Sequence, residues 1–182
     1  GGNICNGVTS ADTASTEVAY DAVLEITSVT GTRTLSIHDF YKGPGKVALE
    51  PGELLTAIVI PKESYENCYG CYIKYAMRNA MDIATIGCSV NVVLSADKKT
   101  IVRARIAYGV AGPVPMRART AEAALNGHPV GEAAVETAGR EVLNDVNPRT
   151  SWRASADFRK QIISETARRG LRAAVERAGG VF

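Results

Sequence analysis

Cysteine and histidine are scarce in this sequence, with four cysteines and two histidines among 182 residues. Cys68 and Cys71 have the spacing of a metal or redox motif, but no second such pair and no paired histidine follows at zinc-finger distance. The segment around Cys71 alternates like a strand, and residues three apart on a strand point to opposite faces. We therefore expect no bound metal, no disulfide and unpaired thiols in a reducing cytoplasm.

Aromatic residues and long apolar runs are also in short supply. Aromatics make up 6% of the sequence, and the arginines of the second half are spread among alanines and glutamates, so we expect no nucleic-acid partner. No apolar run approaches the roughly 18 residues that span a bilayer. The chain opens with Gly1-Gly2-Asn3 and not with a basic segment followed by an apolar one, which predicts neither a membrane span nor a secretory leader. The missing initiator methionine leaves a processed, tagged or truncated chain open.

The formal net charge of +2 hides an uneven distribution. Residues 1–66 carry four Lys/Arg against nine Asp/Glu, a net charge of −5, whereas residues 67–182 carry 17 against 10, a net charge of +7. The polar stretch 62–67 coincides with this shift and predicts a boundary between two modules, 1–66 and 67–182. Attraction between the halves, or to an acidic partner subunit, explains the imbalance.

Hydrophobic periodicity predicts strands first and helices afterwards. A period of two predicts strands over 19–27, 33–37, 53–60, 69–77, 83–94 and 101–108. The first two form a predicted hairpin and the last three an antiparallel meander. A period of 3.6 then predicts helices over 120–126, 130–145 and 155–178. Strands followed by helices, without alternation, indicate the α+β class.

Local signals refine these helices. Thr120 is the expected cap of the first helix. We expect Leu143 on the inward face of the second helix and Phe158 on that of the third, with Arg159 mostly outside the apolar stripe.

Glycine-rich segments are the first candidates for chemistry. Gly43-Pro44-Gly45-Lys46 lacks the flanking residues of a Walker phosphate loop, because Phe40 and Val47 stand where a glycine and a Ser/Thr belong, and we interpret it as a turn. The amides of Gly1 and Gly2 suit close approach to a phosphate, or a simple turn or flexible end. Composition and periodicity by themselves give an α+β domain and no function.

Five motifs taken in order resemble a known family. They are Gly-Gly-Asn-Ile-Cys-Asn-Gly-Val-Thr-Ser-Ala-Asp at 1–12, Gly-Pro-Gly-Lys before the strand ending at Pro61, Lys74-Tyr75-Ala76-Met77-Arg78 with Asp82-Ile83-Ala84, Pro113–Ala118 and Trp152–Arg159. Together they resemble the flavin-binding subunit of molybdenum hydroxylases, in particular that of bacterial xanthine dehydrogenases. The resemblance covers essentially the whole chain.

The resemblance implies a fold. Residues 1–66 would be the second lobe of a PCMH-type FAD-binding domain. Residues 67–182 would be a CO dehydrogenase flavoprotein C-terminal-like domain, a three-stranded antiparallel sheet plus three helices. The family's flavin domain begins about a hundred residues earlier, so we expect the missing N-terminal lobe as a partner. The chain alone is expected to be inactive and to bind FAD weakly or not at all, because it would supply only half of the surface that encloses the cofactor.

The resemblance also implies a role. In the family a molybdenum-binding large subunit acts on the substrate, a small subunit with [2Fe-2S] clusters relays electrons, and the flavin subunit passes them to NAD or another acceptor. This chain would hold FAD noncovalently, position it, and supply the electrostatic environment of the flavin. A structural or docking fragment without flavin, and an unrelated ligand-binding α+β domain, are the alternatives.

Site residues follow from matching positions. Those implied for the first module are Gly1, Gly2, Asn3, Thr9, Ser10 and Asp12. The first three match a loop that contacts the FAD phosphates, and the other three match positions near the ribityl and phosphate groups, with a turn as the simpler interpretation of Asp12.

In the second module, Lys74 matches a lysine near the isoalloxazine, where its positive charge would stabilise negative charge on the flavin. This makes Lys74 the candidate catalytic residue as well as a cofactor ligand. Asp82 and Ile83 match the loop beside the flavin ring, and Arg78 is a possible salt-bridge partner there. A solvated strand lysine and a surface turn are the simpler interpretations of Lys74 and of the loop.

The spacing of Cys68 and Cys71 yields a first testable prediction. Thiol titration of the unfolded, unreduced protein should find all four cysteines free. A count of two thiols, or stoichiometric zinc by elemental analysis, would contradict this expectation.

Overall fold

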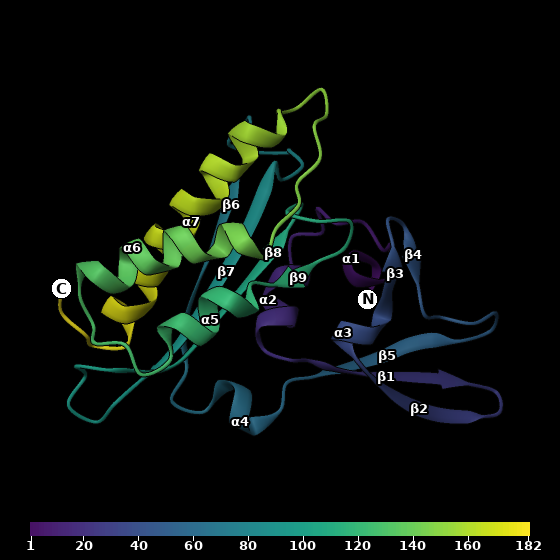
Figure 1. Ribbon diagram of the computed structural model, residues 1–182. Coiled ribbons are helices and arrows are strands. Elements are labelled where there is room, and N and C mark those ends of the chain that lie inside the picture. Colours follow the sequence, from purple (N-terminus) through teal and green to yellow (C-terminus); the bar gives the residue numbers. More distant parts are fainter.

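The computed structural model describes residues 1–182 and is of the α+β class, as predicted (Figure 1). Its first half contains α1 (Gly2–Cys5), α2 (Ala14–Ala19), β1 (Val23–Ser28), β2 (Gly31–Ser36), α3 (Ile37–Phe40), β3 (Tyr41–Gly43), β4 (Lys46–Val47), β5 (Leu54–Val59) and α4 (Lys62–Tyr65). Its second half contains β6 (Tyr69–Tyr75), β7 (Ile86–Leu94), β8 (Ile101–Gly109), β9 (Met116–Arg117), α5 (Arg119–Leu125), α6 (Glu132–Glu141), a 3₁₀ turn (Val142–Asn144) and α7 (Ala156–Arg177). None of the helices has both the length and the apolar character that crossing a bilayer requires.

The first half is built on a three-stranded sheet in the order β2-β1-β5. The predicted hairpin is confirmed, with Val23 opposite Ser36 and Ser28 opposite Gly31. The prediction of a strand from residue 19 is wrong at its start, because Ala19 ends α2. Ala14 and Val18 are both buried at helical spacing, and this packing outweighs the apparent alternation.

The segment between β2 and β5 contains the short helix α3 and a small hairpin of β3 and β4. The Ser36 hydroxyl accepts from the backbone N–H of His38 at 3.3 Å and caps α3. The Gly-Pro-Gly-Lys turn is confirmed between β3 and β4. The N–H of Gly45 donates to the carbonyl of Gly7 at 2.9 Å, which ties this turn to the first residues of the chain.

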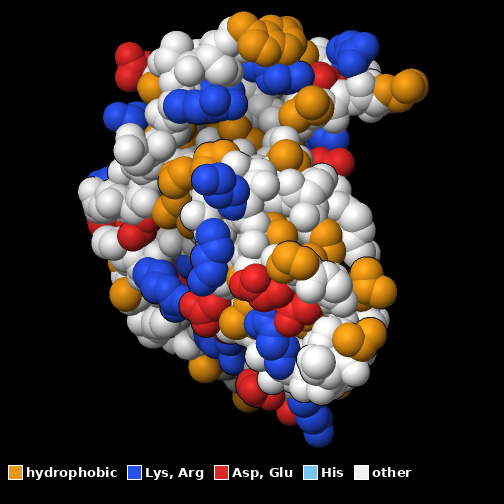
Figure 2. Space-filling view, turned by 90° about the vertical axis from the view of Figure 1, so that its right-hand side faces the viewer, with side chains coloured by type: hydrophobic (Ala, Val, Ile, Leu, Met, Phe, Trp, Pro, Cys, Tyr) orange, Lys and Arg blue, Asp and Glu red, His pale blue; other side chains and the backbone are white.

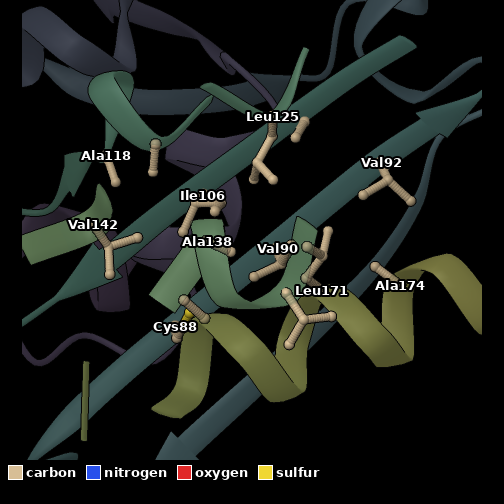
Figure 3. Packing of buried hydrophobic residues seen from close by; sticks show 14 of the residues in the cluster. Cys88, Val90, Val92, Ile106, Ala118, Leu125, Ala138, Val142, Leu171 and Ala174 are labelled. Atoms are coloured by element: carbon tan, nitrogen blue, oxygen red, sulfur yellow. The ribbon is translucent and has the colours of Figure 1, made fainter. Parts of the chain in front are cut away.

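The second half is a four-stranded antiparallel sheet in the order β6-β7-β8-β9, covered on one face by α5, α6 and α7 (Figure 1). The three predicted strands are confirmed, and β9 adds a fourth that is too short for periodicity to reveal. Figure 3 shows Cys88, Val90 and Val92 packing toward Leu171 and Ala174 of α7. The helix lies so close that a Cβ on Gly170 would come within 2.6 Å of Val90 Cγ2, which only glycine permits.

The opposite face of this sheet is covered by the first half of the chain. Helix α2 packs across β7 and β8, so Ser89 and Asn91 are buried although they alternate with the apolar residues. Ala107 of β8 belongs to the hydrophobic cluster of the first half. The boundary between 1–66 and 67–182 stays a prediction, and the two halves share a buried interface.

Several local helix predictions need correction. Thr120 does not cap α5, which begins at Arg119; instead the Asp145 carboxylate accepts from the Thr120 N–H at 2.9 Å and from its hydroxyl at 2.7 Å. Leu143 is 38% exposed because it lies in the 3₁₀ turn, where the tighter winding rotates it off the apolar stripe.

Two residues at the start of α7 also differ from expectation. Phe158 is partly exposed, with its ring 5.9 Å from that of Tyr75. Arg159 is only 2% exposed, because its guanidinium donates to the carbonyl of Arg149 and to the Ser151 hydroxyl.

Asp21 links the two halves by charge. Its carboxylate lies 2.7 Å from His38 Nε2 of the first half, and 2.7 Å and 2.5 Å from the guanidinium groups of Arg105 and Arg117 of the second. Arg117 also pairs with Glu122 at 2.5 Å, and Glu122 accepts from the N–H of Ile106 at 2.9 Å. Burial alone would raise the pKa of Asp21, but the His38 hydrogen bond and the two arginines outweigh it and lower the pKa to about 2.

We predict that Asp21→Asn destabilises the chain by about 2–3 kcal/mol, because Arg105 loses its ion-pair partner and Arg117 keeps only Glu122. Asparagine tolerates the left-handed backbone of this position, where φ is 50°, so the loss reports on charge. The folded pKa lies below the unfolded value of 3.8, so this stabilisation is present above pH 3.8 and disappears as the pH falls toward 2; from the shift it amounts to about 2 kcal/mol.

Denaturant unfolding at pH 7, 5, 3 and 2 measures the contribution of Asp21 to the free energy of unfolding. The difference in unfolding free energy between the original protein and Asp21→Asn should shrink as the pH falls. The exposed Asp39, which forms no ion pair, provides the control Asp39→Asn with little effect at any pH. A difference that is the same at pH 7 and pH 2 would count against the assigned role of Asp21.

Candidate functional site

Strand β6 brings Lys74 to Asp12. The Lys74 ammonium donates to the Asp12 carboxylate at 3.0 Å, across 62 residues of sequence. Tyr72 lies two residues earlier and therefore on the same face of the strand. Burial, followed by the charge of Asp12, raises the pKa of Tyr72 to about 12, so the phenol stays protonated. Asp12 is thus an anchor for β6 as well as a turn residue.

Thr9, Ser10 and Ile83 line one cavity of about 190 Å³. Thr9 and Ser10 come from the loop between α1 and α2, and Ile83 from the loop between β6 and β7. The Ile83 side chain is 49% exposed. Three predicted site residues from distant parts of the chain therefore converge on a single surface.

Asp82 organises the loop between β6 and β7. Its carboxylate accepts from the N–H of Arg78 and of Ile83, each at 2.8 Å, and its side chain is 9% exposed. Burial alone would raise the pKa of Asp82, but these backbone donors, together with the Arg78 charge, lower it. The carboxylate is occupied by its own loop and fixes where Ile83 is presented.

Gly1, Gly2 and Asn3 lie in and before α1. No atom comes within 4 Å of the position that a Cβ would take on either glycine, so this backbone is open. Asn3 Oδ1 accepts from the N–H of Thr13 at 3.0 Å and from its hydroxyl at 2.7 Å, next to Asp12. The cavity lined by Thr9 and Ser10 does not include Gly1 or Gly2.

Sequence analysis did not predict six other residues that line this cavity. They are Val110, Arg149, Ser151, Trp152, Arg153 and Arg159. Trp152 and Arg153 stood in a recognised motif, but their role as cavity walls was not predicted. The available signal was three arginines within the eleven residues 149–159, balanced by Asp157 alone.

Val110 adds backbone strain at this wall. Its φ is 70°, in the left-handed region that a β-branched residue rarely adopts. Such strain concentrates at functional sites, where the surrounding structure holds it in place.

Two protein-family domains match this chain. Residues 71–174 match the CO dehydrogenase flavoprotein C-terminal domain, and residues 1–63 match the FAD binding domain in molybdopterin dehydrogenase. The chain is 45% identical over 180 residues to the xanthine dehydrogenase FAD-binding subunit of Escherichia coli O157:H7, covering 99% of this chain and 61% of that protein.

Two further relatives support the same assignment. The carbon monoxide dehydrogenase medium chain of Afipia carboxidovorans is 31% identical, over 98% of this chain and 60% of its own length. The structure of carbon monoxide dehydrogenase from Hydrogenophaga pseudoflava superposes with a TM-score of 0.89 at 29% identity, covering 97% of this chain and 60% of that one. The chain thus spans about 60% of the length of these relatives.

The fold and the matched domains define a flavoprotein-type α+β chain. The chain belongs to the family of FAD-binding medium subunits of molybdenum hydroxylases.

The loop that carries Thr9 and Ser10 rests on β8, which yields a testable prediction. A Cβ on Gly109 would come within 2.7 Å of the Thr9 carbonyl oxygen, a backbone atom that cannot rotate away. We expect Gly109→Ala to destabilise the protein by about 1–3 kcal/mol and to displace the loop.

Thermal unfolding and amide exchange of residues 8–12 measure this effect. Gly2→Ala is the control, since its Cβ meets nothing within 4 Å, and should leave stability unchanged. A Gly109→Ala protein as stable as the original would show that the loop is free to move off β8.

Proposed function

We propose that this chain is the FAD-holding, electron-transfer part of a xanthine dehydrogenase-like molybdenum hydroxylase. It would pass electrons from iron–sulfur clusters through FAD to NAD or another acceptor. The observation that carries the proposal is the juxtaposition of Lys74 and Asp12 at 3.0 Å, together with Thr9, Ser10 and Ile83 around one cavity. All five match family positions for flavin contacts.

The residues fit a flavin chemically. Gly1 and Gly2 leave open backbone for a phosphate, and Thr9 and Ser10 supply hydroxyl groups for a polyol chain. Ile83 presents an exposed apolar side chain suited to a ring face. When bound, FAD supplies the two-electron chemistry of its isoalloxazine ring.

Lys74 and Asp12 would act as a unit. The Asp12 carboxylate holds the Lys74 ammonium in a fixed place, with the lysine side chain 30% exposed. A fixed positive charge at the edge of a site stabilises negative charge that develops there, at little reorganisation cost. Asp82 positions Ile83 through the loop and would not contact the ligand itself, because its oxygens accept from the backbone.

We further propose that the chain works in a larger assembly. The molybdenum cofactor would reside on a large subunit and the [2Fe-2S] clusters on a small subunit, as the thin supply of cysteine and histidine suggests. Because the chain spans about 60% of its relatives, an N-terminal lobe would complete the flavin cradle. The four free cysteines favour a cytoplasmic location.

Replacing Lys74 tests the proposal. In the assembled oxidoreductase, Lys74→Met should slow reduction of the acceptor by about tenfold, while substrate-driven reduction of the iron–sulfur clusters stays near normal. Stopped-flow absorbance follows both steps. Lys62→Met, at an exposed lysine paired only with Glu66, is the matched control.

Acceptor turnover that is unchanged in Lys74→Met would argue against the electrostatic role. Loss of bound FAD in this variant would instead identify Lys74 as a structural contact. An assembly that contains the partner subunits and no flavin at all would favour the docking-fragment alternative.

A further inference from the structure

A buried tyrosine joins the second sheet to the long helix α7 near the candidate site. Tyr108 of β8 is fully buried, and its hydroxyl donates to the carbonyl of Ile163 in α7 at 2.8 Å. Tyr108 stands opposite Cys88 of β7, and Figure 3 shows Cys88 next to α7. Burial raises the pKa of Tyr108 well above its ordinary value, so the phenol keeps its proton and stays a donor.

Hydrogen bonds of this kind between the sheet and α7 are few. Two side chains make them: Tyr108, and Arg177, which donates to the carbonyl of Gly70. Arg177 is the last residue of α7, whereas Ile163 lies in its first half. The remaining contacts pack apolar side chains, and such packing is not directional. Tyr108 is therefore the directional contact that fixes the first half of α7 on the sheet.

The start of α7 is tied to the segment that precedes it. Arg159 donates to the carbonyl of Arg149 and, at 2.9 Å, to the Ser151 hydroxyl. All three residues line the cavity that also contains Thr9 and Ser10. This start of α7 lies at the upper end of the molecule, where hydrophobic and Lys/Arg side chains gather on the surface (Figure 2). A shift of the first half of α7 would therefore move these lining residues with it.

The end of β8 also supports other parts of the cavity. A Cβ on Gly109 would come within 2.7 Å of the Thr9 carbonyl oxygen, so the loop between α1 and α2 rests on this glycine. Val110, the next residue, lines the cavity with a φ of 70°. Because Tyr108, Gly109 and Val110 are consecutive, one short stretch of backbone meets α7, the loop and the cavity.

We propose that Tyr108 is a positioning residue of the candidate flavin site. Through the carbonyl of Ile163 it holds the first half of α7, and the segment before this helix, at a fixed distance from Thr9 and Ser10. Tyr108 itself does not line the cavity. The identity of the ligand as a flavin rests on the proposed function.

Tyr108→Phe tests the proposal with little risk to the fold. The ring still fills the core, and the Ile163 carbonyl keeps the hydroxyl of Thr166 at 3.1 Å as a donor, so this buried acceptor retains a partner. In the 182-residue protein, amide hydrogen exchange at residues 159–163 should become about tenfold faster. Exchange at residues 170–175 of the same helix should stay unchanged.

Ser164→Ala is the matched control. The Ser164 hydroxyl is also buried and donates to the carbonyl of Gly139 at 2.6 Å, which links α7 to α6 and not to the sheet. Thermal unfolding should show similar losses of stability in the two variants. In the assembled oxidoreductase, flavin fluorescence after dilution measures release of the cofactor. Release should be about tenfold faster in Tyr108→Phe and unchanged in Ser164→Ala.

Three results would overturn the proposal. These are unchanged exchange at residues 159–163 in Tyr108→Phe, faster exchange without faster flavin release, and equally fast flavin release in both variants, which would indicate general destabilisation. Absence of flavin from the unmodified assembly would refute the proposed function and, with it, the ligand. The exchange measurement on the 182-residue protein would still decide whether Tyr108 fixes α7 on the sheet.

Discussion

The carboxylate of Asp21 joins the two halves of this chain, and the candidate site depends on that junction. It accepts from His38 on one side and pairs with Arg105 and Arg117 on the other. The sheet face of the second half that carries Ser89 and Asn91 is covered by α2. Once α2 is fixed on this face, the preceding loop has little freedom, and Thr9 to Asp12 lie over the ends of β6 and β8.

The interface between the two halves also contributes to the candidate functional site. The Lys74–Asp12 pair is a second ion pair between the halves. Lys74 is more exposed than Arg105 and Arg117. Asp12 pairs with one basic side chain, whereas Asp21 contacts three. Asp21 is surrounded by guanidinium groups that its own carboxylate neutralises, so its role is structural. Lys74 is paired with Asp12 but stays 30% exposed, whereas Arg149, Arg153 and Arg159 form no ion pair.

The sequence predicted much of the fold through patterns that act locally. The alternation in β7 and β8, the long helix predicted over 155–178 and the turn between β3 and β4 are all confirmed. Errors arose where a distant residue decided the outcome. Thr120 is held by Asp145, and Arg159 is buried because it satisfies carbonyl and hydroxyl groups of the segment before its helix.

The sequence by itself therefore determined the α+β class, most strands and helices and, through its motifs, the family and the candidate flavin residues. Tertiary structure alone decided which of those residues meet. A pattern records which face of a strand is apolar, but it carries no information on what covers the other face. The pairing of Lys74 with Asp12 and the convergence of Arg149, Arg153 and Arg159 on the cavity beside Thr9 depend on how α2 and α7 pack against one sheet. Such contacts join residues from 60 to 150 positions apart, a separation at which only the balance of packing and charge over the whole chain selects the partner.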